Sequence, residues 1–462
     1  SPERVRSGCE YVDGLRTWAN GHDGNGNGYG NSIAWDFQDF VLPAEPLTPA
    51  PSPDSDFGLA ESTNRSTLLP HQDLENWCPG RSVLDKTNPW PIILAQACRN
   101  TATSDAIASA IGCLAGLYIY DYVADECIRE AVCRRYTMAA ECYKGLLEDP
   151  KSKGPGEGEE CVALGVVLST IHLEGYKQCK HFLHQTDPGG QRSDLCDTLS
   201  VIASCGLLFS QLLAPLADAD PLNLPEQATE FDWLRFGNDQ ETLEIRGGCG
   251  LSTRLMHRIA HVSYCVSYLM QKPESIVFQM TPEYLLRGLE TTQQWSREYK
   301  PWEMAEASQP IERIRSRPTV MIAESKVEVA EVTAEAWRIT AIIYLLCRLL
   351  RLSRNHPRVV GQMDDLARCI RIIPTSGPYF TAQAPLVPVF ILSLLAINPD
   401  HKKVSQTWFG QVLKTPVRSN VPLLLESLKC TWCWIDKDIK TPALPEDLPE
   451  AIRERDPWWE KL

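Results

Sequence analysis

The sequence has no long apolar run and no excess of positive charge. Its longest unbroken apolar run in the most apolar helical stretch is Ala341 to Cys347, whereas a membrane-spanning helix needs about 20 such residues. The net charge is -14, from 45 basic and 59 acidic residues, and tight binders of phosphate backbones carry basic faces. We therefore expect no membrane contact, and we expect DNA to be bound only through a module outside these residues.

The sequence also lacks the common catalytic motifs. It has no Gly-x-Ser-x-Gly elbow, no Walker loop and no His-Glu-x-x-His pair, and the glycines between positions 24 and 30 do not have dinucleotide-binding spacing. Asp364 and Asp365 are adjacent, but Arg368 follows where a magnesium-binding helix would need a further carboxylate. We predict that the chain is not an enzyme and has no catalytic residues.

One segment combines histidines with a cysteine and could suggest a zinc site. Imidazole and thiolate are ligands that zinc prefers, and the segment contains His172, Cys179, His181 and His184. Helical spacing, however, places Cys179 and His184 on different faces. We favour ordinary helix packing and predict no metal there.

A second candidate is the pair Cys430 and Cys433, which has the spacing of zinc and redox sites. No second pair matches it, and no βαβ pattern precedes it. We favour two buried cysteines beside Trp432 and Trp434. Cofactor-binding residues remain unknown, and no cofactor is expected in this chain.

The 17 cysteines are an odd number and are scattered through apolar segments. Those in helical patterns are Cys113, Cys127, Cys205, Cys265 and Cys347. Such cysteines behave as small buried hydrophobic residues in a reducing compartment, so a disulfide framework is not expected. The chain begins without methionine or an apolar leader, which favours a cytosolic or nuclear protein and a fragment of a longer one.

Helical periodicity dominates from Asn88 onward, and strand signals are scarce. The most apolar helix is expected over Ala330–Arg358, with a capping box at Ser325 and Glu328 and an end at Pro357. Its solvent edge is predicted at Arg338, Arg348 and Arg351. Other helices are expected over 92–122, 124–147, 161–183, 195–213, 253–271 (capped near Ser252 or Thr253), 281–299, 359–373, 386–397, 402–413 and 421–435, with a loop at 218–238 and a basic turn at 313–318. The predicted fold is all-α, a large array of about a dozen antiparallel-packed helices with a disordered N-terminal tail.

The order of several segments resembles the regulatory region of fungal zinc binuclear cluster (Zn2Cys6) transcription factors. These segments are Asn88-Pro-Trp90, Ala139–Leu147, the HFLHQ segment at 181–185, Gly250–Ile259, Ala334–Leu350 and Arg418–Trp434. The resemblance covers roughly residues 74–437. It implies an all-helical regulatory domain without catalytic activity, C-terminal to a six-cysteine DNA-binding module.

The N-terminal residues fit the same resemblance. Members similar to this chain end the zinc module with a cysteine followed by a tyrosine and a Leu/Trp element, and Cys9, Tyr11 and Gly14–Trp18 correspond to them. Cys9 would match the last zinc ligand, with the other five missing, so zinc is expected only in a complete N-terminal cluster. The alternative, an ordinary free Cys9 in a tail, stays open.

The resemblance implies three parts. Residues 1–70 would be a linker that includes the end of a truncated zinc module, 71–440 the helical regulatory domain, and 441–462 an acidic segment. We expect a nuclear regulator that forms homodimers or contacts the transcription machinery, with a small-molecule effector. The helix Trp337–Leu350, Trp408-Phe409 and Trp432–Trp434 would suit an apolar pocket, although plain core is the more common use of such residues. The alternative function is a helical scaffold or small-molecule-binding protein unrelated to transcription.

Overall fold

The structure is a computed structural model, and all that follows concerns the residues that it describes. These are 82–84, 88, 90–96, 102–120, 126–148, 163–168, 198, 200–206, 208, 231–271, 281–298, 301–302, 310–318, 321–381, 384–414, 425, 428–429 and 432. Within these ranges it has 13 helices and one two-stranded sheet. The predicted all-α class is confirmed.

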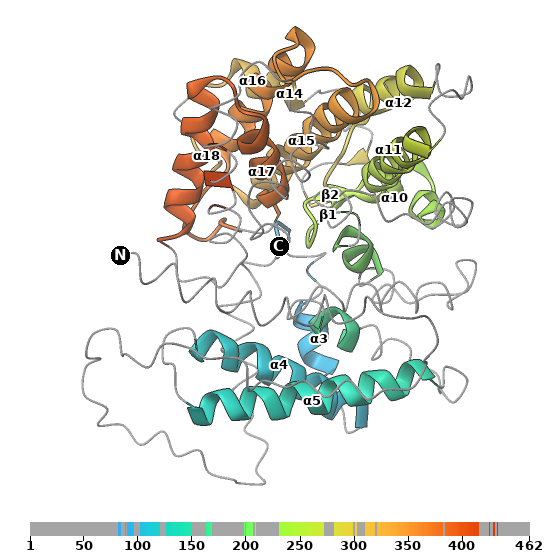
Figure 1. The fold of residues 1–462 in the computed structure, drawn as a ribbon, viewed down its shortest axis with the longest axis vertical. Helices are drawn as coiled ribbons and strands as arrows, with labels where there is room; N and C mark the ends of the chain where they lie inside the picture. The colour runs from blue at the N-terminus through green and yellow to red at the C-terminus, as the bar shows by residue number, and fades with distance from the viewer. Residues whose placement is uncertain are drawn as a thin grey trace.

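The elements follow one another in three groups (Figure 1). The first group is α3 (Trp90–Gln96), α4 (Ala102–Tyr120) and α5 (Glu126–Glu148). The second is η7 (Asp232–Arg235), α10 (Asp239–Leu243), β1 (Ile245–Arg246), β2 (Leu251–Ser252), α11 (Thr253–Gln271) and α12 (Thr281–Glu290). The third is α14 (Pro310–Ser316), α15 (Lys326–Tyr344), the π-helix η9 (Leu345–Leu349), α16 (Pro357–Ile372), α17 (Leu386–Leu395) and α18 (Pro399–Val412).

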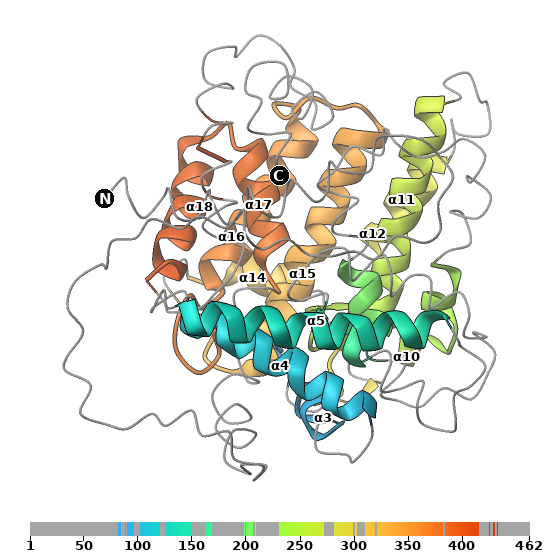
Figure 2. The same ribbon diagram turned by 60° about the horizontal axis from the view of Figure 1, so that its bottom comes forward.

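The described residues bury two hydrophobic cores. The main core is built on α15, with α12, α14, α16 and α17 packed on it and α11 packed on η9. The second core is built from α3, α4, α5 and the helical residues 163–168. Ile202 packs against both cores. Figure 2 shows α4 and α5 lying across the end of the main-core helices.

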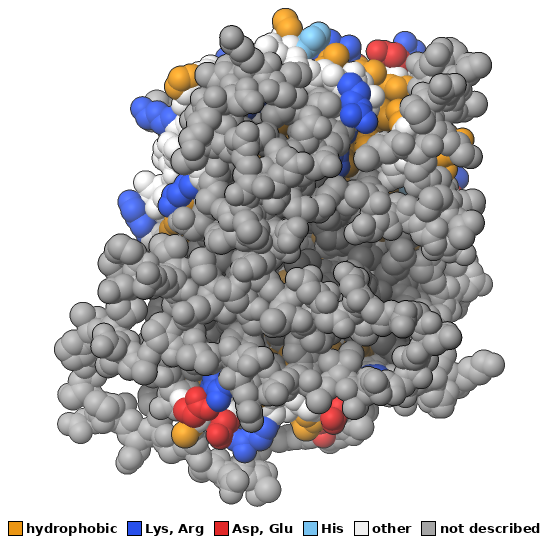
Figure 3. Space-filling model, in the orientation of Figure 1, with side chains coloured by type: hydrophobic (Ala, Val, Ile, Leu, Met, Phe, Trp, Pro, Cys, Tyr) orange, Lys and Arg blue, Asp and Glu red, His pale blue; other side chains and the backbone are white. Residues whose placement is uncertain are grey.

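The α4–α5 pair shows how the second core closes. A Cβ at Gly116 would lie 2.6 Å from Val132 Cγ2, so the glycine allows α5 to approach closely. The polar residues Glu130, Arg134, Arg135 and Lys144 face solvent. Charged side chains of both signs are visible over this end of the molecule in Figure 3.

The central helix begins where it was predicted. Ser325 is the N-cap of α15, and its side chain accepts a hydrogen bond from the Glu328 backbone N–H at 3.2 Å. The Glu328 carboxylate reaches one residue further back than a capping box requires and accepts from the Glu324 N–H at 3.0 Å. The cap therefore satisfies backbone donors that would otherwise lack partners at the helix start.

The predicted end of this helix and its solvent edge are wrong. The helix widens into η9 and ends at Leu349, with Leu350 as its C-cap, while Pro357 is the first residue of α16, where a fixed φ and a missing N–H are tolerated. Arg348 is only 4% exposed and its guanidinium lies over the Tyr344 ring, 5.6 Å from the centroid. Arg338 lies against buried Glu335, and only Arg351 is exposed.

Several other boundaries also differ from the prediction. The helix expected over 92–122 is two helices, α3 and α4, and the helix opened by Thr281 ends at Glu290. The expected basic turn at 313–318 belongs largely to helix α14. Within the expected loop at 218–238, residues 232–235 form a 3₁₀ helix that buries Leu234. The hydrophobic pattern did not predict α14 or the 3₁₀ helix because both are short, with seven and four residues.

Within the described ranges, no cysteine forms a disulfide bond. Cys113, Cys205, Cys265 and Cys347 are buried, as predicted, but Cys127 is exposed on α5. Cys127 lies in the first turn of an amphipathic helix, on the side away from the second core. Several predictions concern residues outside the described ranges. They are the divisions at residues 70 and 440, the N-terminal tail, the acidic C-terminal segment and Cys9.

Among the described helices, none is long and apolar enough to cross a membrane.

The position of η9 yields a stability prediction. Leu346 is 1% exposed in the main core, so Leu346→Asp would bury an unpaired carboxylate and should lower the free energy of unfolding by more than about 4 kcal/mol. Leu413→Asp places the same charge at a position 43% exposed and should change it by less than about 0.5 kcal/mol. Urea unfolding followed by circular dichroism compares them. A fully helical Leu346→Asp protein of normal stability would show that the core is misplaced.

Candidate regulatory site at the glycine-rich hairpin

A short hairpin contacts several segments that are far apart in the sequence. β1 and β2 are antiparallel, with Ile245 opposite Ser252 and Arg246 opposite Leu251. Residues 247–250 form the turn, in which the Arg246 carbonyl accepts from the Gly250 N–H at 2.8 Å. Gly250 has φ +76°, a left-handed conformation that glycine adopts without strain.

The turn lies in direct contact with α15. A Cβ added at Gly250 would lie 2.9 Å from Thr333 Cγ2 and 3.1 Å from Ala384 Cβ. The Trp337 indole N–H donates to the Ala384 carbonyl at 2.8 Å. Two segments of the sequence resemblance, Gly250–Ile259 and Ala334–Leu350, thus meet in space.

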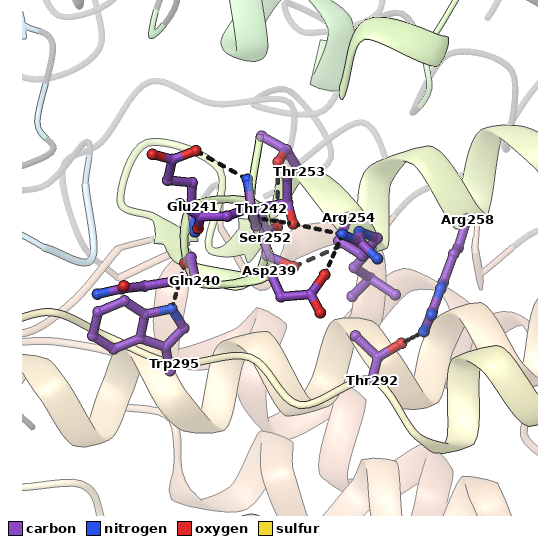
Figure 4. A network of polar contacts seen from close by, with 12 residues as sticks. Asp239, Gln240, Glu241, Thr242, Ser252, Thr253, Arg254, Arg258, Thr292 and Trp295 are labelled. Carbon is purple, nitrogen blue, oxygen red and sulfur yellow. Dashed lines mark hydrogen bonds and ion pairs between the residues drawn. The ribbon is translucent and has the colours of Figure 1, made fainter. Parts of the chain in front are cut away.

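The base of the hairpin is held by a polar network between α10 and the start of α11 (Figure 4). Arg254 Nη2 pairs with Asp239 Oδ1 at 2.7 Å and donates to Thr242 Oγ1 at 2.9 Å. The Thr253 hydroxyl donates to the Thr242 carbonyl at 3.3 Å. Asn238 and Glu241 form a complete capping box at the start of α10. These contacts orient the hairpin relative to α11.

The segment after α12 crosses the same base. The Trp295 carbonyl accepts from the Ile245 N–H at 2.8 Å, and its buried indole donates to the Gln240 carbonyl at 2.7 Å. Gln294 accepts from the Ser252 N–H at 2.7 Å through Oε1 and donates to the Ala334 carbonyl at 2.6 Å through Nε2. A single side chain therefore bridges the hairpin and α15.

Arg258 attaches α11 to the end of α12. Its guanidinium hydrogen-bonds to the Gly288 carbonyl and to the Thr292 hydroxyl, as Figure 4 shows for the second contact. Burial, together with the nearby charge of Arg254, lowers the pKa of Arg258 from its usual range. The half-buried guanidinium donates hydrogen bonds to neutral acceptors.

An N-terminal segment docks on the outside of the turn. We call residues 82–84 the strap. The Val83 N–H donates to the Gly247 carbonyl at 2.9 Å, and Val83 and Leu84 are buried in the main core. The Ser82 hydroxyl donates to the Leu84 carbonyl at 2.6 Å. The strap precedes the second core in the chain but belongs to the main core.

Two cysteines meet at the same turn. The buried thiols of Cys205 and Cys249 hydrogen-bond to each other, and both side chains lie in the main core. Burial, with the contact to Cys249, raises the pKa of Cys205 well above its usual range. Cys205 is therefore a neutral thiol, and its contact with Cys249 joins the helical residues 200–206 to the hairpin.

The acidic pair considered for magnesium is committed to ion pairs. Asp365 receives two hydrogen bonds from Arg315, and Asp364 Oδ1 lies 2.7 Å from His401 Nε2. Within the described ranges, no group of three or more His, Cys, Asp or Glu side chains could hold a metal ion. Two groups considered for zinc, one at His172, Cys179, His181 and His184 and the other at Cys430 and Cys433, lie outside those ranges.

The aromatic residues considered for an effector pocket are part of the main core. Trp337, Trp408 and Phe409 are almost completely buried, and the Trp432 indole donates to the Ser393 carbonyl at 2.9 Å. Trp408 and Phe409 pack edge to face, with ring centroids 5.3 Å apart. Their packing accounts for their spacing, and the effector itself stays a prediction.

Comparison with protein families matches residues 192–459 to the fungal specific transcription factor domain. The match covers more than half of the chain, so the protein belongs to this family, and its role lies in the regulation of transcription. Comparisons with curated proteins and with solved structures gave no match.

The range matched by the family corresponds closely to the main core. It contains the hairpin, α15 and the rest of the main core except the strap, whereas the whole second core precedes it. The resembling segments Gly250–Ile259, Ala334–Leu350 and Arg418–Trp434 lie inside the match, and the three that precede residue 192 lie outside it. The hairpin site therefore joins the family core to an N-terminal extension of this chain.

Sequence reasoning missed the hairpin itself and predicted only the helix that follows it, capped near Ser252 or Thr253. A hairpin signal was present, because Gly247-Gly-Cys-Gly250 separates two short β-compatible pairs. The strap carried no comparable signal.

Gly250 is the position at which the site can be tested most simply. Gly250→Ala should lower the free energy of unfolding by about 1 to 3 kcal/mol, because the added Cβ meets Thr333 and the left-handed φ is strained. Gly361→Ala, in α16 with open space around it, should raise stability by about 0.5 to 1 kcal/mol. Urea titrations of the purified chain measure both.

A second change separates crowding from backbone strain. Thr333→Ser removes the Cγ2 methyl and should restore part of the stability lost in Gly250→Ala, leaving the cost of the positive φ. If Gly250→Ala stabilised the protein as Gly361→Ala does, the close approach of the turn to α15 would be wrong.

Proposed function

We propose that the chain is the non-catalytic regulatory domain of a nuclear fungal transcription factor that acts on RNA polymerase II genes. The observation that carries this is the family match over the main core, together with the strap that ties the N-terminal part of the chain to that core. DNA would be bound through an N-terminal zinc binuclear cluster whose last ligand corresponds to Cys9. The net charge of -14 supports a separate DNA-binding module.

The hairpin site supports a route by which the domain could act on that module. The strap is the first described segment of the chain, and it contacts the turn that presses on α15. A rearrangement of α15 would alter the surface that holds the strap. A ligand or partner shifts such an equilibrium only by its differential affinity for the two arrangements. The strap is therefore the proposed output of the domain.

The inputs follow from the family role. A second copy of the chain, proteins of the transcription machinery and a small-molecule effector are the proposed partners. We assign the helical domain to residues 71–440, with the tail 1–70 as the linker to the DNA-binding module and 441–462 as an acidic segment.

A reporter assay tests the regulatory function. The chain is fused to a foreign DNA-binding domain in a fungal host, with that DNA-binding domain alone as the reference. We expect transcription of the reporter to change at least severalfold, in either direction, under some nutrient conditions. Equal expression from the fusion and the reference under every condition would count against the function.

The strap is tested in the same assay. Leu84→Ala removes buried apolar contact worth about 2 to 5 kcal/mol and should loosen the strap, whereas Ile92→Ala truncates an aliphatic side chain that is 46% exposed. At matched protein levels, we expect Leu84→Ala to change reporter output and Ile92→Ala to leave it unchanged. Identical output from both variants and the parent would remove the strap from the mechanism while leaving the regulatory function intact.

A further inference from the structure

Helix α14 is a short element held by two kinds of contact. Ile311 and Ile314 are buried in the main core. The arginines between and after them alternate along the sequence at 313, 315 and 317 and reach carboxylates on α15 and α16. A helix of seven residues is not stable alone in water, so these contacts determine whether it forms.

The three ion pairs are well defined. Arg313 Nη2 lies 2.8 Å from Glu331 Oε2. Arg315 binds Asp365 with both nitrogens of its fork, at 3.0 and 2.6 Å. Arg317 contacts Glu328 and also donates to the Ile322 carbonyl at 3.2 Å. The bidentate geometry at Asp365 is the stronger form of such a pair.

In two of the three pairs, the arginine is exposed and the carboxylate is buried. The side chains of Arg313 and Arg315 are 48% and 54% exposed, whereas those of Glu331 and Asp365 are 8% and 9% exposed. These two carboxylates are thus buried and depend on arginines that solvent, or another anion, can reach. In the third pair Arg317 is the less exposed partner, at 17% against 32% for Glu328. Removing the partner of a buried charge costs far more than removing an exposed pair.

Ser316 lies in the middle of these arginines. It is the last residue of α14, it is exposed, and its hydroxyl donates to the Arg313 carbonyl at 2.9 Å. In the sequence it has arginines three residues before, one before and one after, and Pro318 follows. The hydroxyl is accessible, and the flanking side chains are all cationic.

We propose that Ser316 is a phosphorylation site for a serine kinase that recognises arginine-flanked substrates, and that phosphorylation releases α14 from α15 and α16. In the reaction the Ser316 oxygen attacks the γ-phosphorus of ATP, a new O–P bond forms, and the bond to the bridging oxygen of ADP breaks. The hydroxyl proton passes to the kinase base. The marginal stability of so short a helix gives the kinase access through local opening.

The release follows from charge and geometry. A phosphoserine carries about -1.5 to -2 charges and three acceptor oxygens. It would compete with Glu331, Asp365 and Glu328 for the guanidinium groups. It also removes the donor to the Arg313 carbonyl and places negative charge at the C-terminal end of a helix, where the macrodipole disfavours it. All three effects weaken the docked state.

The first experiment asks whether the site is used. The full chain is incubated with ATP and the catalytic subunit of cAMP-dependent protein kinase, and phosphopeptides are quantified by mass spectrometry. We expect Ser316 to be the main site and Ser316→Ala to lose most of the incorporated phosphate, whereas Ser353→Ala, between Arg351 and Arg354, keeps it. Phosphate incorporation that is unchanged in Ser316→Ala, or absent from the parent, would overturn the proposal.

The second experiment asks what the modification does. Amide hydrogen exchange over residues 310–318 should be severalfold faster in the phosphorylated chain and in Ser316→Asp than in the parent. Thr291→Asp is the matched control, because Thr291 is exposed just after α12 and its hydroxyl donates to the Arg287 carbonyl at 2.9 Å. It should leave exchange in α14 unchanged. Unchanged exchange in the phosphorylated chain would refute the release. Neither experiment depends on DNA binding or transcription.

Discussion

When a helix is buried on every side, its charged residues are buried too and need partners within the core. In α15 these residues are Glu331 and Glu335, both of which are buried. Arg338, itself largely buried, forms a bidentate pair with Glu335 at 2.6 and 2.9 Å, and Arg313 reaches Glu331 from α14. Because an uncompensated buried carboxylate is very costly, the docking of α14 stabilises the folded state, however short the helix is. The arrangement of α14, α15 and α16 follows from this requirement.

Sequence reasoning recovered the features of α15 that depend on local chemistry. The cap at Ser325 and the apolar core of the helix were predicted from residue types alone, because capping and amphipathic periodicity act over a few residues. The C-terminal end was not, since no local stop signal marks the π-helix, which packs on α11, α12 and α16. The two misassigned arginines, Arg338 and Arg348, show the same limit: charge predicts exposure only where no buried partner or ring is available.

The hairpin site was predictable only in part. The segments that meet there, Gly250–Ile259 and Ala334–Leu350, were singled out for their order in the chain, and the structure supplies the contact between them through Gly250 and Gln294. Their juxtaposition could not be read from one sequence, because strands of two residues have no measurable period. The strap could not be predicted, because the Val83–Gly247 backbone hydrogen bond leaves no mark in the sequence and two buried apolar residues, Val83 and Leu84, are too few to show a period.

The strap also has a consequence for the order in which the molecule can be assembled during synthesis. Its partner, Gly247, lies far later in the chain, and the whole second core is encoded between them. The local contacts of α4 and α5 can therefore form while the hairpin is still unmade, whereas closing the long loop that ends at Val83 carries a larger entropic cost. The strap therefore has no docking site until the hairpin of the main core has formed. A docked strap is thus present only in a chain whose main core has folded.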